Sequence, residues 1–166
     1  MASYKISTLL YCFDPVGRIL LLHRNKEPNM GLWSPCGGKL KVDDGESPYD
    51  CALRELREET GIIAEKKDLH LTGIVSECGG KNKNHWLMFL FELKKYVQKL
   101  PSNCSEGRFA FFKPSELNEI SLPKTDKEYI WPLFWKYRHG FFSVQCLIEN
   151  DQISSWTVEE CWENRI

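Results

Sequence analysis

The sequence lacks both a long hydrophobic run and an excess of charge of either sign. No apolar stretch approaches the roughly 18 residues that cross a bilayer, so we expect no membrane partner. Lysine and arginine total 22 against 23 aspartates and glutamates, and this balance argues against a surface for a nucleic acid polymer. The first 13 residues have neither a basic region nor a small-residue cleavage site. They are therefore interpreted as a strand rather than as a targeting signal.

Cysteines are present, but they lack the spacing of a metal site or a disulfide framework. Their number is odd, at seven, and no CxxC or Cys/His pair occurs at zinc spacing. Scattered, reduced thiols are typical of a cytoplasmic protein. Hydrophobic residues make up 42% and charged residues 27% of the chain, which excludes a disordered tail, collagen and a coiled coil. We expect one globular domain over residues 1–166.

Turn residues divide the chain into expected strands and helices. Strands are predicted at residues 4–13, 19–23, 69–78, 85–96, 108–113, 141–150 and 154–160. The turn "DPVGR" predicts that the first two form a hairpin, and the last two are expected to form another. Short helices are expected at 114–117 and from 126, where Pro132 must kink or restart the second. The pattern indicates an α+β fold, a mixed sheet covered by helices.

A longer helix is expected at residues 48–60. Ser47 suits its N-cap, Pro48 its first position and Gly61 its C-terminal stop. At about 100° per residue, one stripe should pack on the sheet: Tyr49, Ala52, Leu53, Leu56 and Thr60. A separate arc holds Glu55, Glu58 and Glu59, with Arg54 and Arg57 expected on the other side of the stripe.

Two interpretations of the glutamate arc are open. It is either a solvated acidic face or a site for a hard divalent cation such as Mg²⁺ or Mn²⁺. Like charges at this spacing repel, and the C-terminal half of a helix disfavours anions. Paired glycines and Glu46 precede the helix, where backbone can approach a ligand closely. A bound cation and a phosphorylated ligand would account for both features.

The stretch "GGKLKVDDGESPYDCALRELREETGI" resembles the Nudix box, at about residues 38–62. Counting from Glu46, every fixed position matches: Arg54, Glu55, Leu56, Glu58, Glu59, Gly61 and Ile62. Seven residues instead of five separate Gly38 from Glu46, which is a two-residue insertion in the loop.

The resemblance implies the Nudix fold, a mixed sheet sandwiched between helices, and hydrolysis of a nucleoside diphosphate linked to another group. Carried over by position, the metal ligands would be Glu55, Glu58, Glu59, the Gly37 carbonyl and Glu106. Glu106 is alternatively a plain loop acid. Glu55 and Glu58 would be catalytic, while Glu46, Arg54 and Gly61 would have structural roles in the motif.

Beyond the box, "GLWSPCGGK" and "YIWPLFWKYRHGFF" resemble the MutT-type, 8-oxo-dGTP diphosphatase-like branch. Substrate-binding candidates are Arg24, Trp33, Gly38, Lys39 and Asp126. Arg24 is alternatively a solvated strand end, and Trp33 a core residue. That branch reads its purine with an asparagine after the tryptophan and two adjacent aspartates. Here Ser34 stands in the first place, and "KTDKE" offers only Asp126.

The leading hypothesis is an Mg²⁺-dependent hydrolase that converts a nucleoside triphosphate, such as 8-oxo-dGTP, to the monophosphate and pyrophosphate. ADP-ribose and dinucleoside polyphosphates are alternative substrates, and a nucleotide-sensing domain without turnover is an alternative of another class. The expected partner is a small nucleotide, and the chain is expected to be a monomer or homodimer.

Overall fold

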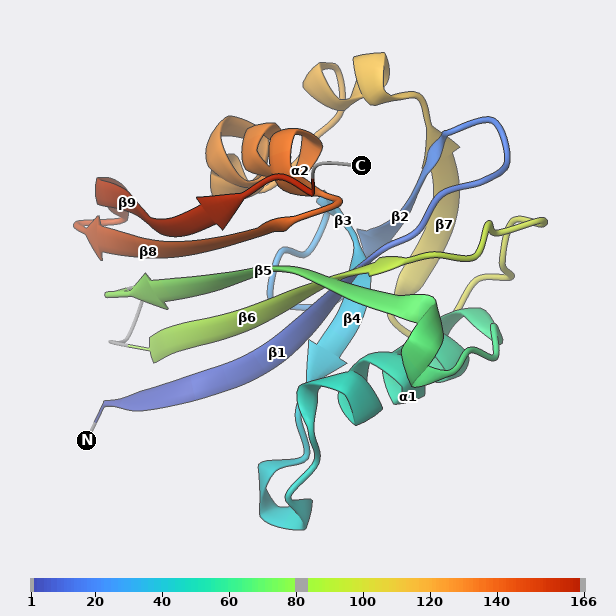
Figure 1. Cartoon of the computed structure of the whole chain (residues 1–166), viewed down its shortest axis with the longest axis horizontal. Helices are drawn as coiled ribbons and strands as arrows, with labels where there is room; N and C mark the ends of the chain where they lie inside the picture. The colour runs from blue at the N-terminus through green and yellow to red at the C-terminus, as the bar shows by residue number, and fades with distance from the viewer. Residues whose placement is uncertain (1, 80–83, 165–166) are drawn as a thin grey trace.

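The computed structural model describes residues 2–79 and 84–164, and in this part of the chain the strands form two sheets (Figure 1). The larger sheet has the order β4 (Cys36–Lys39), β1 (Ser3–Tyr11), β6 (Asn84–Leu93), β5 (Leu69–Cys78), β8 (Phe141–Glu149), β9 (Gln152–Trp162). The smaller has the order β3 (Trp33–Ser34), β2 (Ile19–Arg24), β7 (Gly107–Phe112). Strand β1 is parallel to β6 and β5 to β8, whereas the other pairs are antiparallel. The expected mixed sheet is confirmed.

The predicted hairpin of the first two strands is wrong beyond its turn. Asp14 closes this turn, because its carboxylate accepts the backbone N–H groups of Val16 and Arg18 at 3.1 and 2.8 Å. Past a single bridge between Phe13 and Ile19, the two strands diverge into different sheets. Strand β1 has β4 on one edge and β6 on the other. It therefore has no free edge on which β2 could pair.

Helix α1 (Pro48–Thr60) has the predicted limits. The Ser47 hydroxyl accepts the backbone N–H of Asp50 at 3.1 Å, and Gly61 ends the helix in the left-handed conformation at φ 75°. Ala52 and Leu56 are buried, as the stripe predicts. Cys51 and Glu59 are buried as well. One of the three glutamates, Glu59, thus points inward. The helical periodicity placed all three on an arc apart from the buried stripe and did not predict this.

The second helical region is continuous but irregular. It passes through a π-helical turn, η5 (Asp126–Ile130), into α2 (Trp131–Tyr137). Pro132 lies at the start of α2, where its missing N–H is tolerated. The π-helical turn changes to regular α-helix next to this proline without a break in the helix. Short 3₁₀ turns in the described residues connect other elements: η1 (Val42–Asp44), η2 (Lys66–Asp68) and η4 (Pro114–Asn118).

The large sheet is buried on both faces, with α1 on one side and α2 on the other (Figure 1). Successive residues of a strand point to opposite faces. Leu10 of β1 accordingly packs with Leu56 of α1, while the next residue, Tyr11, packs with Phe134 of α2. The sheet between helices is the fold that the resemblance implies. Among the described residues, no helix is long and apolar enough to cross a membrane.

Candidate active site

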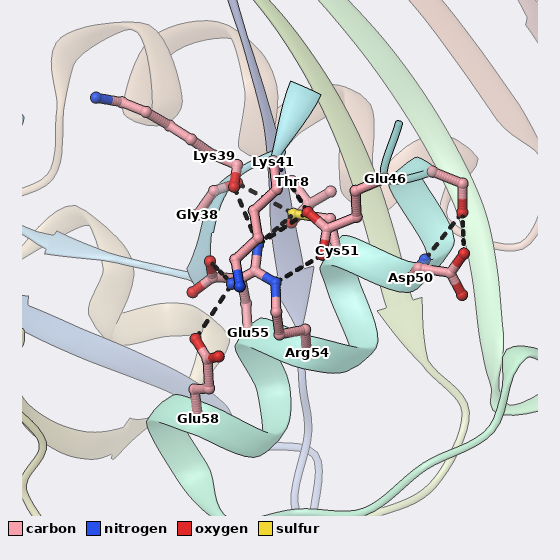
Figure 2. Close-up of polar contacts among 11 residues, drawn as sticks. Thr8, Gly38, Lys39, Lys41, Glu46, Asp50, Cys51, Arg54, Glu55 and Glu58 are labelled. Atoms are coloured by element: carbon pink, nitrogen blue, oxygen red, sulfur yellow. Dashed lines mark hydrogen bonds and ion pairs between the residues drawn. The ribbon is translucent and has the colours of Figure 1, made fainter. Parts of the chain in front are cut away.

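Three residues of α1 form a charged cluster on one side of the helix (Figure 2). One guanidinium nitrogen of Arg54, Nη1, contacts Glu55 Oε1 at 2.6 Å and Glu58 Oε2 at 3.1 Å. Arg54 was expected on the other side of the apolar stripe from the glutamate arc, and its contact with Glu58 fits that position. Residues i and i+4 are neighbours on the helix surface, so Arg54 reaches Glu58 across the solvent side of the helix.

Arg54 also binds the loop that precedes the helix. Its Nε and Nη2 donate to the two carboxylate oxygens of Glu46 at 2.6 and 3.0 Å. The backbone N–H of Lys41 donates to Glu46 at 2.8 Å, and Arg54 donates to the Lys39 carbonyl at 3.1 Å. The Arg54 hydrogen bonds hold the pKa of Glu46 at about 2. Glu46 therefore stays ionised, and the loop carrying the insertion is tied to α1.

Glu59 points between α1 and β4, and only 7% of its surface is exposed. Its carboxylate accepts the backbone N–H of Gly37 at 2.9 Å. Burial raises the pKa of Glu59 to about 8, and the charge of Glu55 adds to this rise, while the hydrogen bond from Gly37 lowers the pKa in part. Burial also raises the pKa of Glu55, although Arg54 opposes it. These two carboxylates lack enough positive charge nearby to compensate for burial.

Gly38 of β4 lies directly against the glutamates. A Cβ atom at this position would be 2.4 Å from Glu55 Cδ, far inside van der Waals contact. Glycine leaves room here for the Glu55 carboxylate, which would have to move if a larger residue stood at this position. The paired glycines therefore lie beside the acidic residues of α1, Gly37 at Glu59 and Gly38 at Glu55.

The chemistry of the cluster fits a hard divalent cation. Its donors are carboxylate oxygens, which Mg²⁺ and Mn²⁺ prefer, and a cation would supply the charge that Glu55 and Glu59 lack. In the described residues, no three acidic, cysteine or histidine side chains stand arranged as a metal site. The Arg54 guanidinium instead lies between Glu55 and Glu58.

A cavity of about 510 Å³ opens beside the three glutamates. Its other wall is the loop Ser102–Glu106, which leads into β7. This brings Glu106 to the same cavity as the α1 glutamates, as its assignment as an extra ligand requires. Sequence reasoning missed the rest of this loop. The signal available was the polar run "PSNCSEG" directly before a strand.

Two basic residues form ion pairs with Glu106, which lines the cavity. Arg24 Nη2 is 3.4 Å from Glu106 Oε2, and Lys26 Nζ is 3.5 Å from Oε1. The side chain of Arg24 is only 13% exposed, so it is not a solvated strand end. Its charge also lowers the pKa of Glu59. Arg24 thus lies close to Glu106 and Glu59, and Lys26 is a neighbour that sequence reasoning missed.

The other three substrate-binding candidates lie away from this cavity. Lys39 Nζ is 5.8 Å from the ring of Trp86, and in Figure 2 its side chain points away from the cluster. Trp33 packs edge-on against Phe112, with ring centroids 4.8 Å apart. Asp126 begins η5, on the α2 side of the sheet. These three residues therefore lie apart from the cavity beside the α1 glutamates.

Comparison with known proteins gives the class. The family model described as the NUDIX domain matches residues 3–134, so the chain belongs to the NUDIX domain family. Within it, the chain is a Nudix hydrolase, and its fold is similar to that of MutT proteins.

Individual relatives support this assignment. The chain is 28% identical over 162 residues to the oxidized purine nucleoside triphosphate hydrolase of Mus musculus, covering 96% of this chain and 97% of the relative. It is 31% identical over 111 residues to the uncharacterized Nudix hydrolase YvcI of Bacillus subtilis, covering 66% of each. The crystal structure of the MutT protein from Bacillus halodurans has a similar fold, with a TM-score of 0.71, 24% identity and coverage of 93% and 97%.

Proposed function

We propose that the chain is a Mg²⁺- or Mn²⁺-dependent hydrolase of a nucleoside triphosphate, or of a related nucleoside diphosphate derivative. The products of the triphosphate reaction are the nucleoside monophosphate and pyrophosphate. Oxidised purines of the 8-oxo-dGTP type are the proposed substrates, with ADP-ribose and dinucleoside polyphosphates as alternatives within the same chemistry. Residues 1–166 act as one domain in this proposal. The seven free cysteines are compatible with the reducing cytoplasm as its location.

One observation carries the proposal: three glutamates of α1 line a cavity together with Glu106. Glu55, Glu58 and Glu59 would hold the cation, with Glu106 and the Gly37 carbonyl as further candidate ligands. Arg24 contacts Glu106, which lines this cavity, and would bind phosphate oxygens that the carboxylates alone would repel. A solvated acidic face would need neither the buried Glu59 nor the glycine approach at Gly38.

The position of each residue indicates its role in the proposed reaction. A bound divalent cation lowers the pKa of water and stabilises charge developing on the phosphates. One glutamate of the motif, Glu55 or Glu58, would accept the proton of the attacking water. Arg54 does not need to touch the substrate, because its hydrogen bonds hold Glu46 and orient both glutamates. It is therefore a positioning residue, and Gly61 serves only to end the helix.

The test is release of pyrophosphate and phosphate from a nucleotide panel, in the presence of Mg²⁺, by the wild type and by Glu58→Gln. The panel contains the usual and 8-oxo nucleoside triphosphates, ADP-ribose and dinucleoside polyphosphates. The wild type should release pyrophosphate from a triphosphate only with the cation present. Glu58→Gln should lower kcat by about 10²-fold or more, since a positioned proton acceptor contributes roughly that much.

The matched control is Glu149→Gln, which removes an exposed charge at the end of β8. It should leave kcat within about twofold of the wild type. If the wild type binds nucleotides but turns none over, the chain is a sensing domain rather than a hydrolase. Equal kcat values for Glu58→Gln and the wild type would contradict the role of the α1 glutamates.

A further inference from the structure

The cavity wall that faces the α1 glutamates is the loop Ser102–Glu106, of which only Glu106 has been given a role so far. The cavity measures about 510 Å³, which is within the range of about 300–1,000 Å³ usual for ligand pockets. An octahedral cation with its water shell takes up about 180 Å³, at roughly 30 Å³ per water. The cavity therefore has room for a larger part of a substrate than a cation and its waters.

The lining of this cavity is polar. Besides Glu106 and the three α1 glutamates it contains Thr60, Gly61 and residues 102–105, and none of these described residues has an aromatic or large aliphatic side chain. Proteins bind nucleobases by stacking them on aromatic side chains. The base of a nucleotide would find no such partner in this lining, so the cavity fits phosphates or hydroxyl groups instead.

Three side chains of the loop can donate hydrogen bonds to a ligand. Ser102, Asn103 and Ser105 are exposed, and their side chains make no hydrogen bond within residues 2–79 and 84–164. The Thr60 hydroxyl, by contrast, already donates to the Leu56 carbonyl at 2.5 Å. Hydroxyl and amide groups are uncharged donors. They can bind a phosphate oxygen without forming ion pairs with the glutamates across the cavity, as a lysine or arginine in their place would.

The hydrogen bonds of the protein itself hold this loop in place. Cys104 and Gly107 exchange two backbone hydrogen bonds, at 3.0 and 3.2 Å, which close the turn through Ser105 and Glu106. The backbone N–H of Asn25 donates to the Glu106 carbonyl at 2.9 Å. Its side-chain amide donates to the carbonyls of Glu106 and Ser105 at 2.8 and 3.1 Å. A loop that is already ordered loses little conformational entropy when a ligand binds.

Positive charge next to the loop favours a phosphate over a sugar. Lys26 Nζ is 3.5 Å from Glu106 Oε1, and Arg24 Nη2 is 3.4 Å from the other oxygen. Both contacts are longer than the 2.7–2.9 Å or so of a strong charged hydrogen bond. The Lys26 side chain is 55% exposed, so its ammonium group can turn toward an anion at the loop. Sugar hydroxyls carry no charge for it to bind.

We propose that Ser102, Asn103 and Ser105 bind the terminal phosphate of a nucleoside triphosphate, with Lys26 supplying positive charge beside them. The inference rests on the proposed function, because it assigns one end of the same substrate. The loop then selects a chain of three phosphates over a chain of two. The pyrophosphate that is released contains the terminal phosphate, so it binds the same donors.

The test measures the binding of inorganic pyrophosphate in the presence of Mg²⁺ by isothermal titration calorimetry. This probe has neither base nor sugar, so the result does not depend on which nucleoside the protein prefers. Asn103→Ala and Ser105→Ala should each raise the Kd about tenfold, the amount expected of one hydrogen bond to a charged group. The matched control is Asn118→Ala, an exposed asparagine at the end of η4, which should keep the Kd within about twofold of the wild type.

Kinetics give a second measurement. For a nucleoside that is turned over, the wild type should have a higher kcat/KM with the triphosphate than with the diphosphate. Asn103→Ala should reduce this preference mainly by raising the KM of the triphosphate. A loop with a merely structural role would change the two substrates alike.

A wild type that does not bind pyrophosphate, or variants that bind it as tightly as the wild type, overturn the inference. Variants that raise the KM of ADP-ribose but keep their affinity for pyrophosphate would assign the loop to a sugar and also overturn it. Weaker pyrophosphate binding by the variants of a chain that turns no nucleotide over would refute the hydrolase proposal and leave the phosphate site standing. Turnover with unchanged pyrophosphate binding in the variants would refute the phosphate site alone.

Discussion

At the scale of single residues, Arg54 performs two tasks. Its Nε and Nη2 hold both oxygens of Glu46, while its Nη1 contacts Glu55 and Glu58. The Arg54 side chain is 15% exposed and the Glu46 side chain 11%, so water screens this pair less than a surface pair. A planar fork of several donors is required for these contacts, and only arginine provides one.

Replacing Arg54 with lysine should therefore destabilise the fold and reduce turnover. One ammonium group cannot reproduce the paired bonds to Glu46 and also reach Glu55, so we expect a loss of about 1–3 kcal/mol. The free energy of unfolding from urea titration measures the first effect and kcat the second, which should fall at least tenfold. Arg57→Lys on the exposed side of the same helix is the control, expected within about 0.5 kcal/mol. Equal stability of the two variants would contradict the tethering role.

At the scale of elements, the site depends on the close approach of β4 to α1. Two glycines make it possible, because Gly37 donates its N–H to Glu59 and Gly38 leaves room for Glu55. The helix is in turn held by its caps, Ser47 and Gly61, and by the burial of Leu56 against the sheet. Neither element positions the carboxylates alone.

Gly38→Ala should abolish turnover while the protein stays folded. The added methyl group would be 2.4 Å from Glu55 Cδ, so the carboxylate must move, and kcat should fall about 10²-fold or more. The control is Gly17→Ala in the β1–β2 turn, where φ is +84° and no atom lies within 4 Å of the new Cβ. That change should cost about 1 kcal/mol of stability without affecting kcat. Normal turnover in Gly38→Ala would show that Glu55 is not needed where it stands.

At the scale of the whole molecule, the large sheet separates two acidic regions. The α1 face carries the cation and phosphate candidates, and the α2 face carries Asp126 and Glu77. The groups facing Asp126 are Glu77 of β5 and Tyr11 of β1, while Cys146 of β8 is beside Glu77. None of these supplies positive charge, so the global stability should depend on the protonation of Asp126.

Asp126→Asn should flatten the dependence of stability on pH. Burial and the charge of Glu77 raise the pKa of Asp126 from 3.8 to about 7. The folded state therefore binds more protons than the unfolded state between these values, and wild-type stability falls as pH rises from about 4 to 7. At pH 8 the variant should be more stable than the wild type by about 1–2 kcal/mol, and this difference should shrink toward pH 4.

Urea titrations at several pH values measure this difference. Glu149→Gln removes an exposed carboxylate and should change stability by an amount that is nearly independent of pH. A difference between Asp126→Asn and the wild type that stays constant from pH 4 to 8 would contradict a raised pKa at Asp126.

Local patterns of the sequence by themselves determined α1, its caps, most strands and the helical irregularity next to Pro132. Capping, helical periodicity and proline geometry act over a few residues, so they can be read from a segment alone. The Nudix motif likewise identified Glu55, Glu58 and Glu59 because its spacing lies within one helix.

Only the tertiary structure decided which distant segments meet. It placed β1 and β2 in different sheets, turned Glu59 inward, and brought the Ser102–Glu106 loop to the glutamates. It also brought Glu77 close enough for its charge to raise the pKa of Asp126, which follows 49 positions later in the sequence. The physical reason is that strand pairing and burial depend on the edges and faces that other elements leave free. A local sequence pattern does not contain the information on which edges and faces these are.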